Sequence, residues 1–238
     1  MSNTYFQFKQ FTVHQQHCSM KVTTDSCLFG AWVAERLQNK KTVKHILDIG
    51  SGTGLLSLML AQNTAANITG IELQQQDYLQ SLQNAAASPW KENITMTHAD
   101  VRHYCFDKKF EVIISNPPFY ETDLRSSNTN KNIAHHSEGL TLDTLCRIIQ
   151  QQLSPQGIFY LLLPAIRNKA LQGALLKTGL FINQVTFVHQ TENHSAFRIM
   201  VEGSFSEGQQ PAGKMMIKEK GVYSAAFVQL LKDYYLHL

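Results

Sequence analysis

The chain has 238 residues, of which 43% are hydrophobic and 16% are charged, and its formal net charge is +3. This length and apolar content can bury the core of one α/β domain with additions, which argues against two equal domains. The small charge neither requires nor excludes a nucleic-acid partner. No stretch supplies the roughly 20 apolar residues of a membrane span, and the first residues lack a signal pattern, so we expect a cytoplasmic protein with no membrane partner.

The cysteines and histidines do not indicate a metal site. The four cysteines are Cys18, Cys27, Cys105 and Cys146. They are far apart and form no C-x-x-C pair, so we expect reduced thiols. His135 and His136 are adjacent and cannot share one face of a helix, so we predict that no metal is bound.

Residues 1–44 precede the first buried strand, and we expect them to form a cap on the main domain, residues 45–238. Apolar residues nearly alternate at the start of this segment, which predicts a short hairpin or strands. A helix then follows, which Asp25 or a neighbouring hydroxyl can cap. In the alternative interpretation, Lys21, Thr24 and Asp25 lie over the glycine loop of the next element and help to hold the amino-acid end of a cofactor.

A glycine-rich turn follows the first buried strand. Apolar residues at 46–49 lead into three closely spaced glycines, and an apolar run at 55–61 continues beyond them. This pattern predicts a strand, a ligand-binding loop and a helix, because glycines let the backbone approach a ligand closely. The spacing G-x-G-x-G differs from the G-x-G-x-x-G of nicotinamide enzymes. The acid before it suits a ligand with an ammonium group or free hydroxyls, and S-adenosylmethionine carries both. The candidate contacts are Asp48, Gly50, Ser51, Gly52 and Gly54.

Two further predicted strands are each followed or ended by an acid. The strand at 67–73 contains Glu72, eighteen residues beyond Gly54, where a carboxylate can accept hydrogen bonds from ribose hydroxyls. The strand at 93–98 is followed by Asp100, which can accept from the amino group of an adenine. Because the carboxyl ends of parallel strands lie along one crevice, we predict that both acids bind the ligand of the glycine loop.

The motif Asn116-Pro117-Pro118-Phe119 follows the strand predicted at 110–115. Two consecutive prolines remove two N–H donors and fix an extended turn, so the neighbouring carbonyls are presented as acceptors. The Asn116 side-chain oxygen and the Pro117 carbonyl can accept from both hydrogens of an amino group, and Phe119 offers a ring for stacking. We therefore predict that these four residues form a catalytic site for a planar amine or amide.

The rest of the chain completes an α/β pattern. Helices are predicted at 74–87, 142–153 and 166–177, a strand at 157–163, and an antiparallel hairpin at 181–190 and 196–205. The polar segment 121–140 is either a loop that closes over substrate or a connection without a role. We expect a doubly wound α/β sandwich around a mostly parallel sheet, with an N-terminal cap.

The glycine loop, Glu72, Asp100 and the motif at 116–119 together resemble class I S-adenosylmethionine-dependent methyltransferases that act on exocyclic or amide nitrogens. The segments 6–11 and 21–32 are similar to bacterial tRNA1(Val) (adenine(37)-N6)-methyltransferases, and the similarity runs nearly end to end. This resemblance implies a Rossmann-like, seven-stranded, mostly parallel sheet and S-adenosylmethionine as cofactor. It also implies methylation of N6 of adenine 37, next to the anticodon, in tRNA1(Val).

The partner that this resemblance implies is the anticodon loop of a tRNA, and we expect the protein to be a monomer. The Asn-Pro-Pro-aromatic motif is shared with enzymes that methylate guanine N2 in rRNA or glutamine in proteins, so it leaves those activities open. A cofactor-dependent binding or regulatory module is a further alternative, although such a module needs no rigid pair of amine acceptors.

Overall fold

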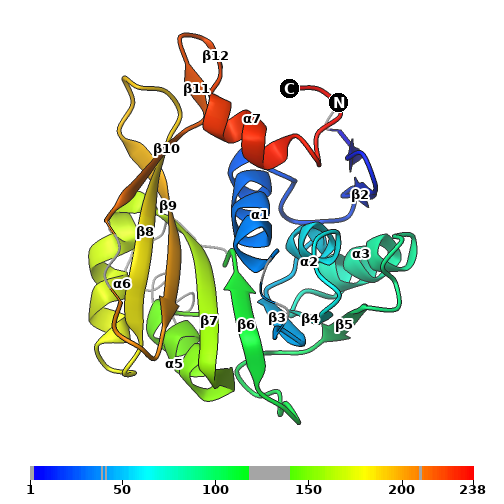
Figure 1. Ribbon diagram of the computed structural model, residues 1–238. Coiled ribbons are helices and arrows are strands. Elements are labelled where there is room, and N and C mark those ends of the chain that lie inside the picture. The colour runs from blue at the N-terminus through cyan, green and yellow to red at the C-terminus, as the bar shows by residue number, and fades with distance from the viewer. Residues whose placement is uncertain (1–2, 39, 41, 118–139, 209–210) are drawn as a thin grey trace, which may run out of the picture.

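The computed structural model describes residues 3–38, 40, 42–117, 140–208 and 211–238. Within these residues, an eight-stranded sheet with the strand order β10-β8-β9-β7-β6-β3-β4-β5 forms the centre of the molecule. Helices cover both faces of this sheet (Figure 1). The expected doubly wound α/β fold is therefore confirmed.

Five neighbouring strands of this sheet run parallel to one another. They are β3 (His45–Ile49), β4 (Asn67–Glu72), β5 (Ile94–His98), β6 (Phe110–Ser115) and β7 (Leu153–Pro164). The chain first builds β4 and β5 outward on one side of β3, and then places β6 and β7 on its other side. The strand order therefore reverses between β3 and β6, which is where ligands bind in open α/β sheets.

The remaining strands extend the sheet beyond β7. β8 (Phe181–His189) and β9 (Ala196–Ser204) form the expected antiparallel hairpin, with β9 between β7 and β8. β10 (Gly213–Met216) pairs in parallel with β8 and adds an eighth strand to the seven that the family resemblance implies. It has only four residues, Gly-Lys-Met-Met, and this is too short for a period-two pattern to reveal it.

Four helices of the described residues lie on one face of the sheet and contribute to one core cluster. They are α1 (Thr24–Leu37), α2 (Leu55–Ala61), α3 (Gln75–Ala86) and α7 (Ala225–Leu231). α1 packs closely on α2 because Gly30 has no side chain, and a Cβ there would lie 2.7 Å from Met59 Sδ. α1 therefore shares the core of the sheet, and the division into a cap at 1–44 and a main domain at 45–238 stays a prediction.

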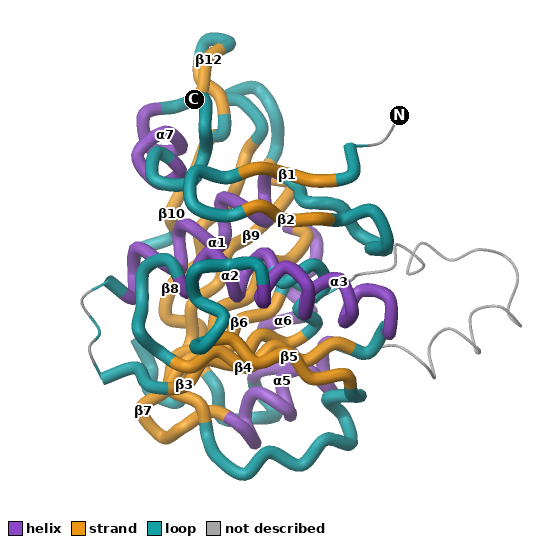
Figure 2. The backbone as a smooth tube through the Cα atoms, turned by 90° about the vertical axis from the view of Figure 1, so that its right-hand side faces the viewer, coloured by secondary structure: helices purple, strands orange, loops and turns teal. Residues whose placement is uncertain are grey.

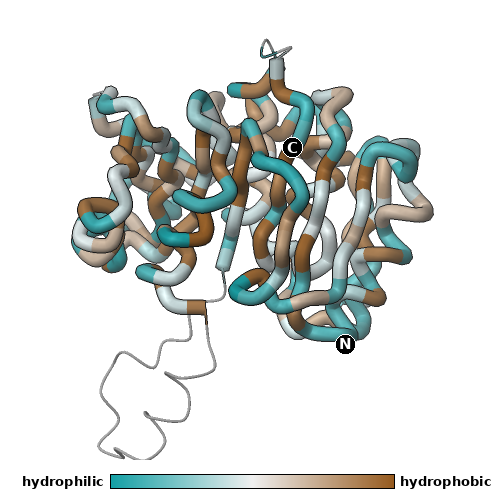
Figure 3. Tube along the Cα trace, turned by 90° about the horizontal axis from the view of Figure 1, so that it is seen from below, coloured by the Kyte–Doolittle hydropathy of each residue, from teal (hydrophilic) through white to brown (hydrophobic). Residues whose placement is uncertain are grey.

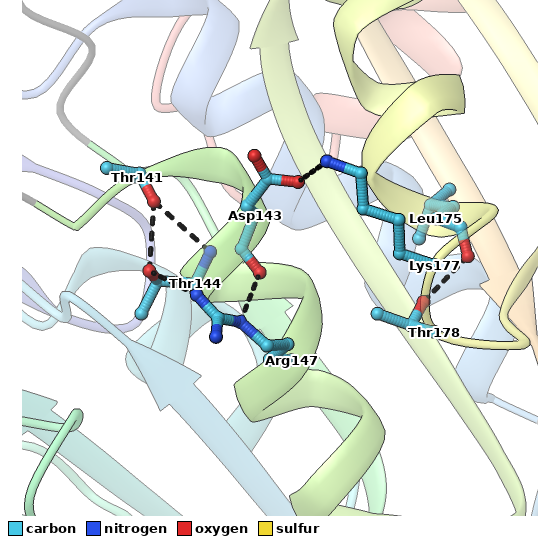
Figure 4. A network of polar contacts seen from close by, with 7 residues as sticks. All are labelled: Thr141, Asp143, Thr144, Arg147, Leu175, Lys177 and Thr178. Atoms are coloured by element: carbon cyan, nitrogen blue, oxygen red, sulfur yellow. Dashed lines mark hydrogen bonds and ion pairs between the residues drawn. The ribbon is translucent and has the colours of Figure 1, made fainter.

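The opposite face is covered by α5 (Leu142–Gln152), η2 (Ala165–Arg167) and α6 (Asn168–Leu175). η2 and α6 together replace the single helix predicted at 166–177. Figure 4 shows the polar contacts at the ends of α5 and α6: Thr141 caps α5 by accepting from the Thr144 N–H, and Lys177 Nζ lies 3.0 Å from Asp143 Oδ1. This ion pair is exposed, so it adds less than about 1 kcal/mol to stability.

Alternate residues of each strand pack on the two faces of the sheet. In β3, Ile46 lies in the cluster on the α1 face, whereas Leu47 and Ile49 lie in the cluster on the α5 face. Hydrophobic segments accordingly lie along the strands, and the outer turns are mainly hydrophilic (Figure 3). None of the described helices is both long and apolar enough to cross a membrane.

In the part of the chain that the structure describes, two small hairpins lie outside the central sheet. β1 (Tyr5–Gln7) and β2 (Thr12–His14) form the predicted N-terminal hairpin, which lies beside α3 (Figure 2). The Phe8 ring after β1 is buried and lies 6.0 Å from that of Tyr235, so the hairpin also packs on the last residues of the chain. β11 (Lys218–Glu219) and β12 (Val222–Tyr223) form the second hairpin, directly before α7.

Candidate active site

The glycine loop joins β3 to α2 at the carboxyl end of β3. Gly50, Gly52 and Gly54 have φ values of 72°, 53° and 80°, which residues with a Cβ disfavour. A Cβ built on Gly50 or Gly52 meets no atom within 4 Å, so these two glycines border open space. At Gly54 a Cβ would lie 3.1 Å from Met96 Cε. The loop therefore needs glycine for its turn, and it leaves room for a ligand to approach the backbone.

Asp48 lies at the end of β3 next to this loop and is fully buried. The Ser57 hydroxyl donates to Asp48 Oδ2 at 2.7 Å, whereas Oδ1 has no hydrogen-bond partner in the described part of the chain. Burial raises the pKa of the Asp48 carboxyl to about 7, although the hydrogen bonds from Ser57 oppose this shift. The buried Ser51 hydroxyl also lacks a partner among the described residues. Two orphaned polar oxygens beside the loop suit a polar ligand.

The raised pKa of Asp48 predicts that stability depends on pH. A carboxyl whose pKa is higher in the folded state stabilises the fold while it is protonated, so this contribution is complete below about pH 4 and is lost as the pH rises through about 7. Relative to Asp48→Asn, which does not titrate, the wild-type free energy of unfolding should fall by about 2 to 4 kcal/mol over this range. Urea unfolding of both apoproteins at several pH values measures the difference, and a constant difference would contradict the shift.

Glu72 is the last residue of β4 and is almost completely buried. Its Oε2 accepts from the Gly52 N–H at 2.9 Å, and its Oε1 accepts from the Gln74 N–H at 2.8 Å. Each carboxylate oxygen has two lone pairs and can still accept from a hydroxyl. Glu72 thus lies beside the glycine loop, as a ribose contact requires, and the contact itself stays a prediction.

Asn116 and Pro117 directly follow β6. The register of the sheet pairs Ser115 with Ile49, so Asn116 comes after β6 at the level at which Gly50 comes after β3. Ser115 Oγ donates to Ile49 O at 2.7 Å and joins the two strand ends. Ile49 is also paired with Ile71, so Glu72 lies at this same level on β4. Three adjacent strand ends therefore carry Asn116, Gly50 and Glu72, and the outer two are about 10 Å apart because neighbouring strands are separated by about 4.8 Å.

Asn116 is partly buried and Pro117 is buried. Pro118 and Phe119, the other two members of the predicted catalytic motif, lie outside the described residues, as does the segment 121–139. The role of Phe119 as a stacking ring stays a prediction.

Asp100 follows β5 but already has a partner. Arg102 Nη2 lies 2.6 Å from Asp100 Oδ2, and Arg102 Nε lies 2.9 Å from Oδ1. The hydrogen bonds from Arg102 are the main reason that the pKa of Asp100 falls to about 2. An adenine amino group would have to share this carboxylate with Arg102, and its contact with Asp100 stays a prediction.

The start of α1 lies at the edge of the sheet where β7 ends and β9 begins. Thr23 is the N-cap residue and accepts from the Ser26 N–H, so a neighbouring hydroxyl, and not Asp25, caps this helix. Asp25 Oδ2 instead accepts from Arg198 Nε at 2.7 Å, on β9. Lys21 Nζ donates to the Gln15 carbonyl. Thr24 is exposed as the first residue of the helix.

These contacts do not test the prediction that Lys21, Thr24 and Asp25 hold the amino-acid end of a cofactor. They show that the Asp25 carboxylate is held in place by an ion pair with Arg198.

Three polar residues near the site were not predicted from the sequence: Ser57, Asn84 and Arg198. Ser57 is the one polar residue in the apolar run of α2, and that interruption could have identified it as a partner for Asp48. Asn84 donates to the Thr53 carbonyl from α3. Arg198 reaches Asp25 across 173 residues of sequence, and no local pattern indicates such a contact.

The arrangement fits S-adenosylmethionine. Open space over Gly50 and Gly52 leaves room for the ligand beside the backbone. The orphaned Asp48 Oδ1 suits an ammonium group, and the Glu72 carboxylate suits ribose hydroxyls. The acceptors of Asn116 and Pro117 follow the neighbouring strand at the same level.

Comparisons with known proteins identify the family of the chain. A family model described as "Methyltransferase small domain" matches residues 29–156. The tRNA1(Val) (adenine(37)-N6)-methyltransferase of Phocaeicola vulgatus is 35% identical over 100% of both chains, and that of Dyadobacter fermentans is 37% identical over 98% of both. A crystal structure of a predicted O-methyltransferase from Agrobacterium tumefaciens has the same fold, with a TM-score of 0.66, 19% identity, and coverage of 88% of this chain and 96% of that one. The chain therefore belongs to the tRNA1(Val) (adenine(37)-N6)-methyltransferase family.

Proposed function

We propose that this protein transfers the methyl group of S-adenosylmethionine to N6 of adenine 37, next to the anticodon, in tRNA1(Val). The observation that carries the proposal is the register of β4, β3 and β6, because it aligns Glu72, the glycine loop and Asn116 along one edge of the sheet. A cofactor site and a pair of amine acceptors are thereby neighbours, as methyl transfer to an amino group requires. The names of the full-length relatives support adenine N6 and tRNA1(Val) as the target.

The residues next to the amino group activate it by accepting hydrogen bonds. The N6 lone pair of adenine is delocalised into the ring, so the nitrogen is a weak nucleophile until it becomes tetrahedral. Asn116 Oδ1 and the Pro117 carbonyl accept from both N6 hydrogens, which favours that geometry and stabilises the positive charge that develops on nitrogen. No general base is needed before transfer, because water can take the proton afterwards. The bound cofactor supplies an electrophilic methyl group on a sulfonium sulfur.

The proposal assigns the cofactor contacts as follows. Glu72 accepts from the ribose hydroxyls, Asp48 receives the ammonium group, and Asp100 accepts from the adenine amino group of the cofactor. Gly50, Ser51, Gly52 and Gly54 border the cofactor along the loop, and Lys21, Thr24 and Asp25 stand near its amino-acid end. Phe119 stacks on the target base, while Pro117 and Pro118 keep the turn rigid.

The tRNA partner presents the base in its anticodon loop. A nucleotide in a loop costs less to extrude than a paired one, which favours adenine 37 as a target for a site in a crevice. The same proposal places the protein in the cytoplasm, where tRNA is found, and takes it to act as a monomer.

Mass spectrometry of nucleosides from total tRNA tests this function. Cells without the gene should lack N6-methyladenosine at position 37 of tRNA1(Val), and the purified enzyme with S-adenosylmethionine should restore it in vitro. Methylated guanine N2 would favour the guanine-N2 alternative. In a parallel assay with S-adenosylmethionine that carries a tritiated methyl group, tritium that stays acid-precipitable after ribonuclease treatment would favour methylation of protein glutamine. Cofactor binding without transfer to any of these substrates would favour a regulatory module.

A further inference from the structure

The segment from His14 to Val22 connects β2 to α1 and is referred to below as the strap. It is folded on itself at Gln15: the side-chain Oε1 of Gln15 accepts from the Val22 N–H at 2.7 Å, and its main-chain carbonyl accepts from Lys21 Nζ. The strap therefore forms a closed turn before Thr23 caps α1. Its two ends are thus drawn together at Gln15.

Asn84 of α3 ties the beginning of the strap to the glycine loop. Its Oδ1 accepts from the His14 N–H at 2.9 Å, while its Nδ2 donates to the carbonyls of His14 at 2.8 Å and Thr53 at 2.9 Å. Thr53 lies between Gly52 and Gly54. One buried amide group thus holds the strap and the glycine loop at a fixed separation.

Asp77 joins the middle of the strap to the first turn of α3. Its Oδ1 accepts from the Ser19 N–H at 2.9 Å, and its Oδ2 accepts from the Ser19 hydroxyl at 2.5 Å. Asp77 lies in the first turn of α3, which begins just after Glu72. The strap therefore passes from the glycine loop toward Glu72, the residue predicted to bind the ribose.

Both anchors lie on the same side of α3, because residues seven apart are two helical turns apart. Asp77 is 5% exposed and Asn84 is 1% exposed. Burying such polar groups costs free energy, and all the hydrogen bonds given above go to the strap and the glycine loop. Apolar side chains at these two positions could also stabilise the fold. The hydrogen bonds of Asp77 and Asn84 in addition fix one arrangement of the strap relative to α3 and the glycine loop.

We propose that the strap is the wall that closes the cofactor site, and that Asn84 and Asp77 are positioning residues that hold it in the binding-competent arrangement. This inference rests on S-adenosylmethionine as the cofactor of the proposed function, but not on its RNA substrate. Releasing the strap should weaken cofactor binding, since binding would then have to order the strap again. It should leave the chemistry of the bound complex intact, because Asn116 and Pro117 follow β6, whereas both strap anchors lie on α3.

Two substitutions test the anchors separately. Ser19→Ala removes one hydrogen bond from an exposed residue and should not impair folding, and Asn84→Ala releases the strap from the glycine loop. By titration calorimetry, the Kd for S-adenosylmethionine should rise about 5-fold in the first variant and about 10-fold or more in the second, as expected for the loss of one or more hydrogen bonds. The kcat at saturating cofactor should stay within about twofold of wild type.

Limited trypsin digestion supplies a readout that does not depend on activity. Lys21 lies in the strap and is a trypsin site, so S-adenosylmethionine should protect the bond after Lys21 in the wild type and protect it less in both variants. Ser88→Ala is the matched control, because Ser88 is buried just beyond α3 and bonds only to Ala85 and Trp90 in the interactions described. This control should bind the cofactor and resist trypsin as the wild type does.

Wild-type Kd values and wild-type protection at Lys21 in both anchor variants would overturn the proposal and leave the strap a structural element. If Asn84→Ala does not fold, the Kd and the trypsin protection of Ser19→Ala alone decide whether the strap closes the cofactor site. A wild-type protein that binds no S-adenosylmethionine would refute the cofactor assignment itself, and this outcome is distinct from failure of the strap. A protein that binds the cofactor but does not methylate tRNA leaves the strap measurements valid.

Discussion

Replacing Asn116 with alanine should lower kcat about 10²- to 10³-fold and leave S-adenosylmethionine binding nearly unchanged. The proposed role of the Asn116 side chain is to accept from the target amino group as positive charge develops on nitrogen. Loss of one preorganised polar partner of a transition state has an effect of this size. Single-turnover rates on unmodified tRNA measure it, and calorimetry measures cofactor binding in parallel.

The Asn116→Asp variant is the control for this prediction. Aspartate keeps an acceptor oxygen at the same reach, so it should retain more activity than alanine. An alanine variant as fast as the wild type, or an aspartate variant no better than alanine, would show that Asn116 is not the amine acceptor.

Replacing Glu72 with alanine should weaken S-adenosylmethionine binding by about 1.5 to 3 kcal/mol, the range for losing hydrogen bonds to a charged group. Two physical causes act together here. The variant loses the acceptor for the ribose hydroxyls, and it also releases the Gly52 N–H that Glu72 Oε2 holds at 2.9 Å. Titration calorimetry measures the change in Kd directly.

Glu111→Ala is a matched control for Glu72→Ala. Glu111 Oε2 also accepts from two backbone N–H groups, those of Lys44 at 3.1 Å and His45 at 2.7 Å, but at the amino end of β3. Its removal should lower stability without changing cofactor affinity. If both variants lose affinity equally, or if a folded Glu72→Ala variant loses none, Glu72 is not a cofactor ligand.

The parallel strands could be predicted from the sequence because each is a compact apolar run that ends at polar residues. β6 occupies 110–115 as predicted, and α3 differs from its predicted bounds by one residue at each end. β10 could not be predicted, because four residues are too few to show an alternation of apolar and polar side chains. Its partner β8 is also distant in the sequence. Sheet membership of so short a strand is decided by tertiary contacts.

The places of Glu72 at the end of β4 and of Asp100 just after β5 could also be predicted, because both follow from the pattern of apolar runs that end at acids. Their partners could not. The turn after β5 brings Arg102 back onto Asp100, and Asp25 meets Arg198 only when β9 is inserted beside β7. Hydrogen-bond partners of this kind depend on backbone conformation and topology, neither of which a residue pattern specifies.

β10 gives this side of the sheet a short border strand. The main-chain groups of an edge strand are free to pair with another molecule, and long edge strands rich in apolar residues promote aggregation. Without β10, the outermost strand on this side would be the nine-residue β8, Phe-Ile-Asn-Gln-Val-Thr-Phe-Val-His. β10 replaces it at the border with a strand of four residues that includes Gly213 and the exposed Lys214. A short border strand with a charged side chain offers few main-chain pairing positions to a second copy of the chain.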